Sequence, residues 1–230
     1  MRESARRGRR HPPSTPLFSP SAAWCYYIYY VFGATLFKPG TIPSRAAVAN
    51  QIRVASAAMP LYAVLPSLVE AAAERGWTAA VSRVADLGGG AGYFASFAAY
   101  MAFVEFGVYW MHRGLHDFKP GYRLLHHTHH KYNKEHTLSP FAGLAFNALD
   151  GILQAIPYAV GLLFIPMHFF THELLLFLTA IWTASIHDCL DAGMAPIMGA
   201  GFHTIHHTTY RHNYGHYFTY MDKAFGSLVT

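Results

Sequence analysis

Histidine is concentrated in this chain in a pattern that suits metal binding. The 230 residues include 16 histidines, and the stretches "HRGLH", "HHTHH" and "HTIHH" hold the most tightly spaced of them. Residues at positions i, i+3 and i+4 lie on one face of an α-helix, so each stretch is expected to aim its imidazoles at one point. The eight histidines with this spacing are His112, His116, His126, His129, His130, His203, His206 and His207.

The number of these histidines predicts a centre with two metal ions. An HxxHH pattern is expected on the order of 0.1 times in a chain of this composition, whereas it occurs twice. Eight imidazoles exceed the coordination shell of one ion, and neutral imidazole suits iron, zinc, copper or nickel. Structural zinc normally recruits cysteine, and hydrolytic zinc needs only three protein ligands and a water. We therefore predict a redox-active pair of iron ions.

Four further residues near these stretches are candidates for binding or supporting the metal. "SIHDCLD" places His187 and Asp191 four positions apart, so a carboxylate could complete the shell of one ion. A polar pair at the membrane interface is the alternative interpretation. His212 and His216, in "RHNYGHY", are close to the third stretch but separated by a glycine, so we expect them to hydrogen-bond to ligands instead of binding metal.

Other polar residues are expected to have structural or supporting roles. Glu105 lies inside an apolar segment, where an ionisable side chain usually faces protein or a cavity, so it is expected to support the centre or to bond a neighbouring helix. His168 and His172 are predicted to lie at the far turn of a hairpin, away from the histidine stretches. His127 and His136 fall off the helix face that the clustered histidines share.

Composition indicates that a membrane protein carries these histidines. Apolar residues make up 53% of the chain and charged residues 13%, about half the usual charged share of a soluble domain. Basic residues gather in "RRGRR" near the start and around the histidines, without forming one long stripe. This distribution is typical of membrane-flanking segments, and it argues against nucleic-acid binding.

Apolar segments of suitable length predict an all-α integral membrane bundle. Residues 91–111 carry one charge and are long enough, at 1.5 Å per residue, to cross a hydrocarbon core of about 30 Å. Residues 148–186 are about twice as long as one crossing requires, which predicts a hairpin. The apolar segments 57–72 and 23–38 are shorter than residues 91–111. We expect about four transmembrane helices, a histidine-rich helical cap on one side holding the di-iron site, and a disordered basic tail over residues 1–22.

One of the remaining stretches is predicted to connect two crossings. Residues 38–53 are polar, and residues 73–90, "AERGWTAAVSRVADLGGG", indicate a connector with an amphipathic turn or two. Since the predicted hairpin returns the chain to its starting side, the histidine stretches on either side of it are expected to face the same compartment.

The histidine stretches resemble the HxxxH, HxxHH and HxxHH pattern of the fatty acid hydroxylase and sterol desaturase superfamily. The strings "VEFGVYWMHRGLHD", "LSPFAGLAF", "DGILQAIP", "IWTASIHDC" and "MGAGFHTIHHTTYRHNYGHY" are similar to the plant-type delta-7-sterol C-5(6)-desaturases, or lathosterol oxidases. The resemblance extends from about Trp24 to Ser227. It implies one fatty acid hydroxylase-like membrane domain over residues 23–230, with the histidine boxes within 112–216.

This resemblance implies a multi-pass enzyme of the endoplasmic reticulum membrane whose histidine boxes face the cytosol. Such an enzyme uses O2, two histidine-bound iron ions and electrons from NAD(P)H through cytochrome b5 or its reductase to introduce the C-5(6) double bond into delta-7 sterols during sterol biosynthesis. The iron ligands would be the eight clustered histidines, with His187 as a further candidate. A sterol C-4-methyl oxidase or lipid hydroxylase on the same scaffold, and a non-catalytic histidine-rich membrane metal-binding protein, are the alternatives.

The chain also departs from the family pattern. Asp191 stands where the plant pattern "HDCIH" has its second histidine, and Asn147 stands where "FHPxDG" has histidine. If the imidazole at 191 is a ligand in relatives, Asp191 must replace it here. Counting crossings backward from a cytosolic first box leaves "RRGRR" in the lumen, against the positive-inside tendency. We expect that 23–38 does not fully cross, or that an upstream helix of relatives is missing.

Overall fold

Helices form almost all of the regular structure in this computed structural model, which describes residues 42–133, 137–187 and 195–230. The predicted tail at 1–22, the apolar segment at 23–38, His136 and Asp191 lie outside the described residues. The elements are α3 (Arg45–Tyr62), α4 (Val64–Glu74), β1 (Ala80–Val81), η1 (Val84–Leu87), α5 (Gly89–Asp117), α6 (Lys119–Gly121), η2 (Tyr122–His126), α7 (His127–His130), η3 (Pro140–Leu144), α8 (Ala148–Phe164), β2 (Met167–His168), α9 (Phe169–Ile186), α10 (Ala200–Thr209) and α11 (Tyr220–Ala224).

Within the described residues, three helical stretches are long and apolar enough to cross a membrane: Arg45–Glu74, Gly89–Asp117 and Phe169–Ile186. The apolar helix α8 is shorter. Large apolar side chains on these helices point outward, as in Phe94, which is 69% exposed. An outward apolar surface suits contact with lipid chains, which solvate it better than water does. The predicted all-α membrane bundle of about four crossings is confirmed in outline.

The polar stretch 38–53 is helical from Arg45 onward, where α3 begins. Ser44 caps the helix by accepting a hydrogen bond from the Ala47 amide at 3.2 Å. The polar side chains of this stretch belong to a helix that packs on protein. Gln51, for example, is fully buried and bonds Ser139, so its polarity does not mark a solvent-exposed loop.

The predicted hairpin at 148–186 is confirmed as α8 and α9, which turn at β2. Strand β2 pairs in parallel with β1, with Ala80 opposite Met167. Helices α5 and α8 approach closely where Gly107 faces Pro157, since a Cβ at 107 would lie 2.6 Å from the Pro157 Cβ. Between the end of α4 and the start of α5, the connector at 73–90 contains the short strand β1 and one helical turn, the 3₁₀ segment η1.

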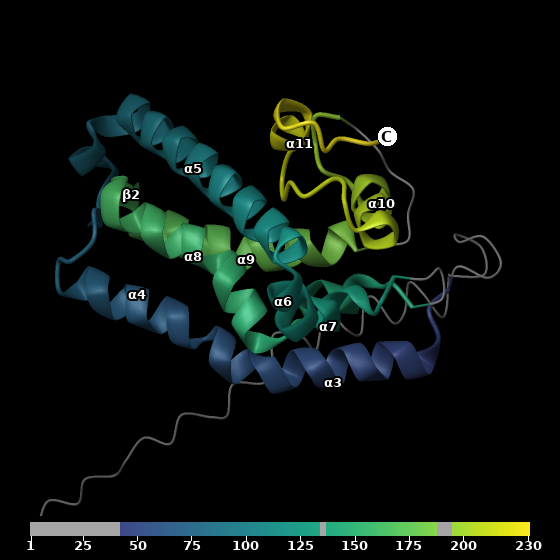
Figure 1. Ribbon diagram of the computed structural model, residues 1–230. Coiled ribbons are helices and arrows are strands. Elements are labelled where there is room, and N and C mark those ends of the chain that lie inside the picture. The colour runs from purple at the N-terminus through teal and green to yellow at the C-terminus, as the bar shows by residue number, and fades with distance from the viewer. Residues whose placement is uncertain (1–41, 134–136, 188–194) are drawn as a thin grey trace, which may run out of the picture. The chain divides into compact units, whose positions relative to one another are not determined.

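The clustered histidines lie at one end of this arrangement, and the apolar core lies between them and the far turn of the hairpin. Figure 1 shows β2 at one end of the α8–α9 hairpin, and α7 and α10 near the opposite end, where α5 finishes. The apolar core lies between these two ends, where it joins α4, α5, α8 and α9. Its buried members are Val69, Tyr100, Val104, Val108, Tyr158, Leu162, Met167 and Leu175. This core fixes the helices whose ends carry the histidines.

Candidate metal centre

Three helical segments bring the clustered histidines together. The last two turns of α5 carry His112 and His116. The chain then forms the π-helical segment η2, which ends at His126, and continues directly into the short helix α7. Single π-helical turns occur frequently at functional sites because they redirect the side chains that follow. Helix α10 supplies the third set.

Among the residues that the structure describes, nine imidazoles form two compact groups, within each of which the candidate ligand atoms lie no more than 4.8 Å apart. The first, here called the five-histidine group, contains His112, His116, His126, His130 and His206. The second, the four-histidine group, contains His129, His187, His203 and His207. His187, a further candidate ligand from the sequence, thus lies beside three histidines of the predicted stretches.

The expectation that each HxxHH stretch aims at one point is wrong, because both stretches are divided between the groups. His126 and His130 enter the five-histidine group, whereas His129 enters the four-histidine group. In α10, His206 separates in the same way from the pair His203 and His207. Successive residues of an α-helix are about 100° apart, so an i, i+4 pair stays aligned while the histidine beside it points elsewhere.

The hydrogen bonds of His187 show that a cation fits the four-histidine group. Its Nδ1 lies 2.6 Å from the Thr183 carbonyl, which can only accept, so Nδ1 carries the proton and Nε2 is a bare lone pair. That Nε2 faces the Nε2 atoms of His129, His203 and His207 at 3.0–3.1 Å. Nitrogens bound to one ion at about 2.1 Å lie roughly 3 Å apart in neighbouring positions. A metal ion suits this convergence better than hydrogen bonds among neutral imidazoles.

The same reasoning applies to the five-histidine group. His126 Nδ1 donates to the Asp150 carboxylate at 2.8 Å, and His206 Nδ1 donates to the His212 carbonyl at 2.8 Å. Both Nε2 atoms are therefore bare, yet both face His130 Nε2, at 3.0 and 3.1 Å. One N–H on His130 cannot satisfy two acceptors, so this group also fits a cation.

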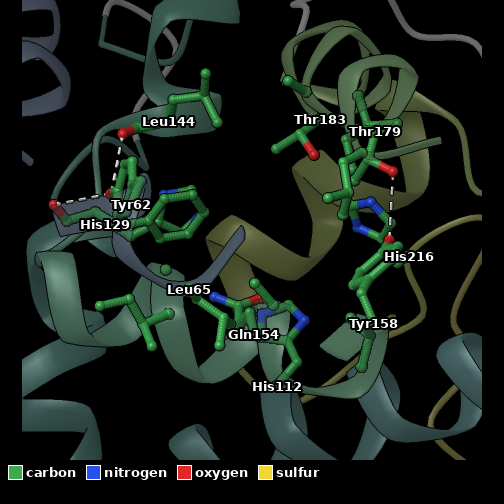
Figure 2. Close-up of a pocket in the computed structure, with 18 of the residues that line it drawn as sticks. Tyr62, Leu65, His112, His129, Leu144, Gln154, Tyr158, Thr179, Thr183 and His216 are labelled. Carbon is green, nitrogen blue, oxygen red and sulfur yellow. Dashed lines mark hydrogen bonds between the residues drawn. The ribbon is translucent and has the colours of Figure 1, made fainter. Parts of the chain in front are cut away.

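A mostly apolar pocket of about 300 Å³ opens beside both groups. Its walls include His112 from the five-histidine group and His129, His187 and His203 from the four-histidine group. Figure 2 shows His112, His129 and His216 around the pocket, with Tyr158 and Thr179 beside His216. Apolar residues from α3, α4, α8 and α9 complete the lining. Such a cavity suits an apolar ligand presented to the imidazoles.

Comparison with known proteins identifies the family. The fatty acid hydroxylase family model matches residues 97–227. The chain belongs to the fatty acid hydroxylase family. It is 57% identical over 205 residues to the Delta(7)-sterol-C5(6)-desaturase of Nicotiana tabacum, covering 89% of this chain and 75% of that protein.

Two other relatives extend this comparison across kingdoms. The putative Delta(7)-sterol-C5(6)-desaturase 2 of Arabidopsis thaliana is 54% identical over 209 residues, which is 90% of this chain and 74% of that protein. The lathosterol oxidase of Homo sapiens is 32% identical over 207 residues, 87% of this chain and 67% of that protein. No solved structure matches the chain. These matches confirm the predicted resemblance to the fatty acid hydroxylase and sterol desaturase superfamily and to its plant-type delta-7-sterol C-5(6)-desaturases.

In this fatty acid hydroxylase family member, burial keeps the imidazoles of the four-histidine group neutral. Desolvation, followed by neighbouring imidazoles, holds the pKa of His129, His203 and His207 well below the usual value. Burial lowers the pKa of His187 to about 4, although its bond to the Thr183 carbonyl opposes the shift. Neutral imidazole is the form that binds metal, so burial maintains the ligand state at neutral pH.

Several candidates from the sequence lie outside both groups. The Glu105 carboxylate accepts hydrogen bonds from the backbone amides of residues 216–218, at 3.0–3.2 Å. His212 contributes its carbonyl to His206, while its own ring lies near Thr209. His216 lines the pocket with a buried Nε2 that has no partner within the described part of the chain.

The far-turn histidines and His127 occupy the positions expected of them. His172 is buried beside Tyr100, whose hydroxyl lies 2.8 Å from His172 Nδ1. His168 lies in β2 near the Ser82 carbonyl. His127 is exposed on α7. These three rings belong to neither group.

Asp150 is a functional candidate that the sequence reasoning missed. It is fully buried on α8, and its carboxylate accepts from His126 Nδ1 and from the Gln154 amide. A carboxylate behind a metal-binding histidine fixes the ring and raises its basicity. The available signal was an ionisable residue at the start of an otherwise apolar hairpin, where burial is costly without a partner.

Proposed function

We propose that the chain is an O2-dependent sterol desaturase that introduces the C-5(6) double bond into delta-7 sterols during sterol biosynthesis. The observation that carries the proposal is the apolar pocket whose wall contains imidazoles from both histidine groups. The names of the tobacco, Arabidopsis and human relatives support the choice of substrate and bond. Membership of the family and these relatives make the chain an oxidoreductase.

The reaction needs two hydrogens to leave adjacent ring carbons. Overall, the sterol loses both, and O2 with two electrons and two protons becomes two waters; cytochrome b5 or its reductase is the proposed electron donor. Two iron ions held by the nine imidazoles would activate O2 and supply an oxidant strong enough for an unactivated C–H bond. The histidines hold neutral nitrogens in place, and the apolar walls keep bulk water away from the reacting carbons.

Polar groups in the pocket wall offer a way to orient the substrate. Tyr158, Thr179, Thr183 and Gln154 line the pocket among apolar side chains. A sterol has one hydroxyl on a large apolar ring system, so a few fixed polar groups can select one orientation of the rings. We propose that these side chains engage the hydroxyl and so determine which ring carbons lie beside the imidazoles.

The membrane placement is part of the same proposal. The three candidate spans suit a multi-pass protein, and we propose that it resides in the endoplasmic reticulum with the histidine end facing the cytosol. Residues 23–230 would form the membrane desaturase domain behind a tail at 1–22. A sterol dissolved in the bilayer then reaches the pocket without crossing water.

Expression in a yeast strain that lacks its own C-5 desaturase tests the function. We expect 5,7-diene sterols to reappear in the sterol profile. Accumulation of a hydroxylated sterol would identify a hydroxylase instead. An unchanged profile in cells that contain the iron-loaded protein would contradict both activities.

A pocket-filling variant tests whether the substrate binds where we propose. Ala155 lines the pocket, so Ala155→Phe should abolish product and leave iron content unchanged. Ala98 is exposed on the outer face of α5, which makes Ala98→Phe the matched control with normal activity. Full activity of Ala155→Phe would place the substrate elsewhere.

A further inference from the structure

The loop formed by residues 212–218 orients two imidazoles of the five-histidine group. The His212 carbonyl accepts a hydrogen bond from His206 Nδ1 at 2.8 Å. The Tyr214 carbonyl accepts one from His112 Nδ1 at 2.9 Å. Each bond places the ring proton on Nδ1 and leaves Nε2 free to face the centre. The loop therefore determines where two of the five Nε2 atoms point.

Two buried carboxylates hold the amide side of this loop. Asp222 accepts from the amides of Tyr214 and Gly215, both at 2.8 Å. Glu105 accepts from the next three amides, those of His216, Tyr217 and Phe218, at 3.2, 3.0 and 3.2 Å. Five consecutive backbone N–H groups thus end on two side chains, from α5 and α11.

The carbonyl side of the loop is held as well. The Trp182 indole N–H donates to the His216 carbonyl at 2.7 Å. The Met198 amide donates to the Tyr217 carbonyl at 2.9 Å. Because protein groups satisfy the loop on both sides, its shape does not depend on contacts with a metal ion. The loop also forms part of the pocket wall, through Gly215 and His216.

Burial makes this arrangement costly unless both sides are present. Glu105 is 6% exposed and Asp222 is fully buried. A buried carboxylate without donors is strongly unfavourable, and successive backbone N–H groups form a concave site that stabilises an anion. The same N–H groups would be unsatisfied without the carboxylates. The acids and the loop therefore stabilise each other.

We propose that Glu105 and Asp222 are positioning residues that hold the 212–218 loop in its metal-binding shape before any metal arrives. They act through the loop carbonyls on His112 and His206 and do not themselves bind the metal. The inference rests on the proposed metal centre and is independent of which sterol is the substrate. Under this proposal, Glu105 of α5 has a specific role, which is to hold the loop that orients two imidazoles of the metal centre.

Iron titration of the full-length, metal-stripped protein in detergent tests the proposal. Glu105→Gln and Asp222→Asn keep the side-chain size but turn one acceptor oxygen into an NH2 group that faces backbone donors. We expect each variant to bind Fe²⁺ about 10-fold to 100-fold more weakly than wild type, the usual effect of removing a group that orients a ligand. Wild-type affinity in both variants would overturn the proposal.

A far-end variant separates positioning from general stability. Tyr100→Phe removes a buried bond to His172 at the opposite end of the helices, so it should lower the melting temperature while iron affinity stays at the wild-type value. If Glu105→Gln behaves like Tyr100→Phe in both measurements, Glu105 is only a packing residue. If wild type itself binds no iron, the proposed metal centre fails, and the positioning role fails with it.

Hydrogen exchange of wild type keeps the proposal testable should both variants misfold. The amides of 214–218 should be protected in the metal-free protein and gain little protection when Fe²⁺ is added. Protection that appears only after iron binds would show that the metal orders the loop, and it would overturn the proposal.

Discussion

The two histidine groups differ in how firmly the protein orients their rings. In the five-histidine group, the Nδ1 atoms of His112, His126 and His206 donate to Tyr214, Asp150 and His212 respectively. In the four-histidine group, His187 alone has such a partner among the residues the structure describes, the Thr183 carbonyl. The buried Nδ1 atoms of His129, His203 and His207 have none there.

This difference indicates that the five-histidine group is the more preorganised of the two. A ring fixed through Nδ1 loses less rotational freedom on binding metal, which favours affinity. In the four-histidine group, packing and a bound ion would have to align three of the rings. We expect the first equivalent of iron to enter the five-histidine group and the second to bind more weakly.

Removing His187 should have the largest effect. Its Nε2 faces the other three nitrogens of its group, and it supplies the one ring there that a carbonyl orients. His187→Ala should lower 5,7-diene product more than about 100-fold and eliminate the weaker iron. Sterol profiling and iron analysis of purified protein measure both. A variant that retains both irons would show that the four-histidine group is not a metal site.

Asp150→Asn should weaken the preorganised group specifically. The substitution removes the negative charge of the Asp150 carboxylate, to which His126 Nδ1 donates a hydrogen bond. We expect the tighter iron to bind about 10-fold to 100-fold more weakly, with the weaker iron nearly unaffected. Asp86→Asn, which removes an exposed ion pair with Arg83, is the control. An unchanged tight site would mean that carbonyl contacts alone preorganise the group.

Sequence spacing predicted the eight histidines, but not how they divide. Periodicity gives the face of a helix on which His129 and His130 lie, and it carries no information on what each face meets. That outcome depends on where α5 ends and on the π-helical segment η2 that redirects α7. Both are settled by tertiary packing, which overrides local helix preference.

Some hydrogen-bond partners of the imidazoles could be predicted from the sequence, and others could not. Asp150 was detectable, because a carboxylate in an apolar helix needs a donor. The carbonyls of Tyr214, His212 and Thr183 were not, because every residue has a carbonyl and its direction depends on the backbone alone. Membrane helices were predictable from apolar length, whereas the start of α3 was hidden by polar residues that face protein.

Lowering the pH should reduce the folding stability of the metal-free protein, because its buried imidazoles resist protonation. Burial holds the pKa of His203 and His207 well below normal, and that of His187 at about 4. The unfolded chain binds protons near pH 6.5 while the fold excludes them, so stability is complete above that pH and falls as pH drops toward 4. Each ring contributes up to about 1.4 kcal/mol per pH unit.

Chemical denaturation of the metal-free protein between pH 7.5 and 4.5 measures this slope. His203→Gln should make it shallower, because one excluded proton is removed. His127→Gln, at an exposed position outside both groups, is the matched control. Equal slopes in all three proteins would mean that the four-histidine group opens to water without metal. The four-histidine group would then differ still more from the preorganised five-histidine group.

The smallest effect is expected at Asn147, which departs from the expected pattern "FHPxDG". Its side-chain oxygen accepts from the Leu149 amide at 3.0 Å and so caps α8, the helix that carries Asp150. Asn147→Ala should cost about 1 kcal/mol of unfolding free energy and leave both iron affinities unchanged. Asn147→His restores an imidazole that belongs to neither group. If it tightens iron binding, the two-group description is incomplete, and if it does not, this departure affects only the helix start.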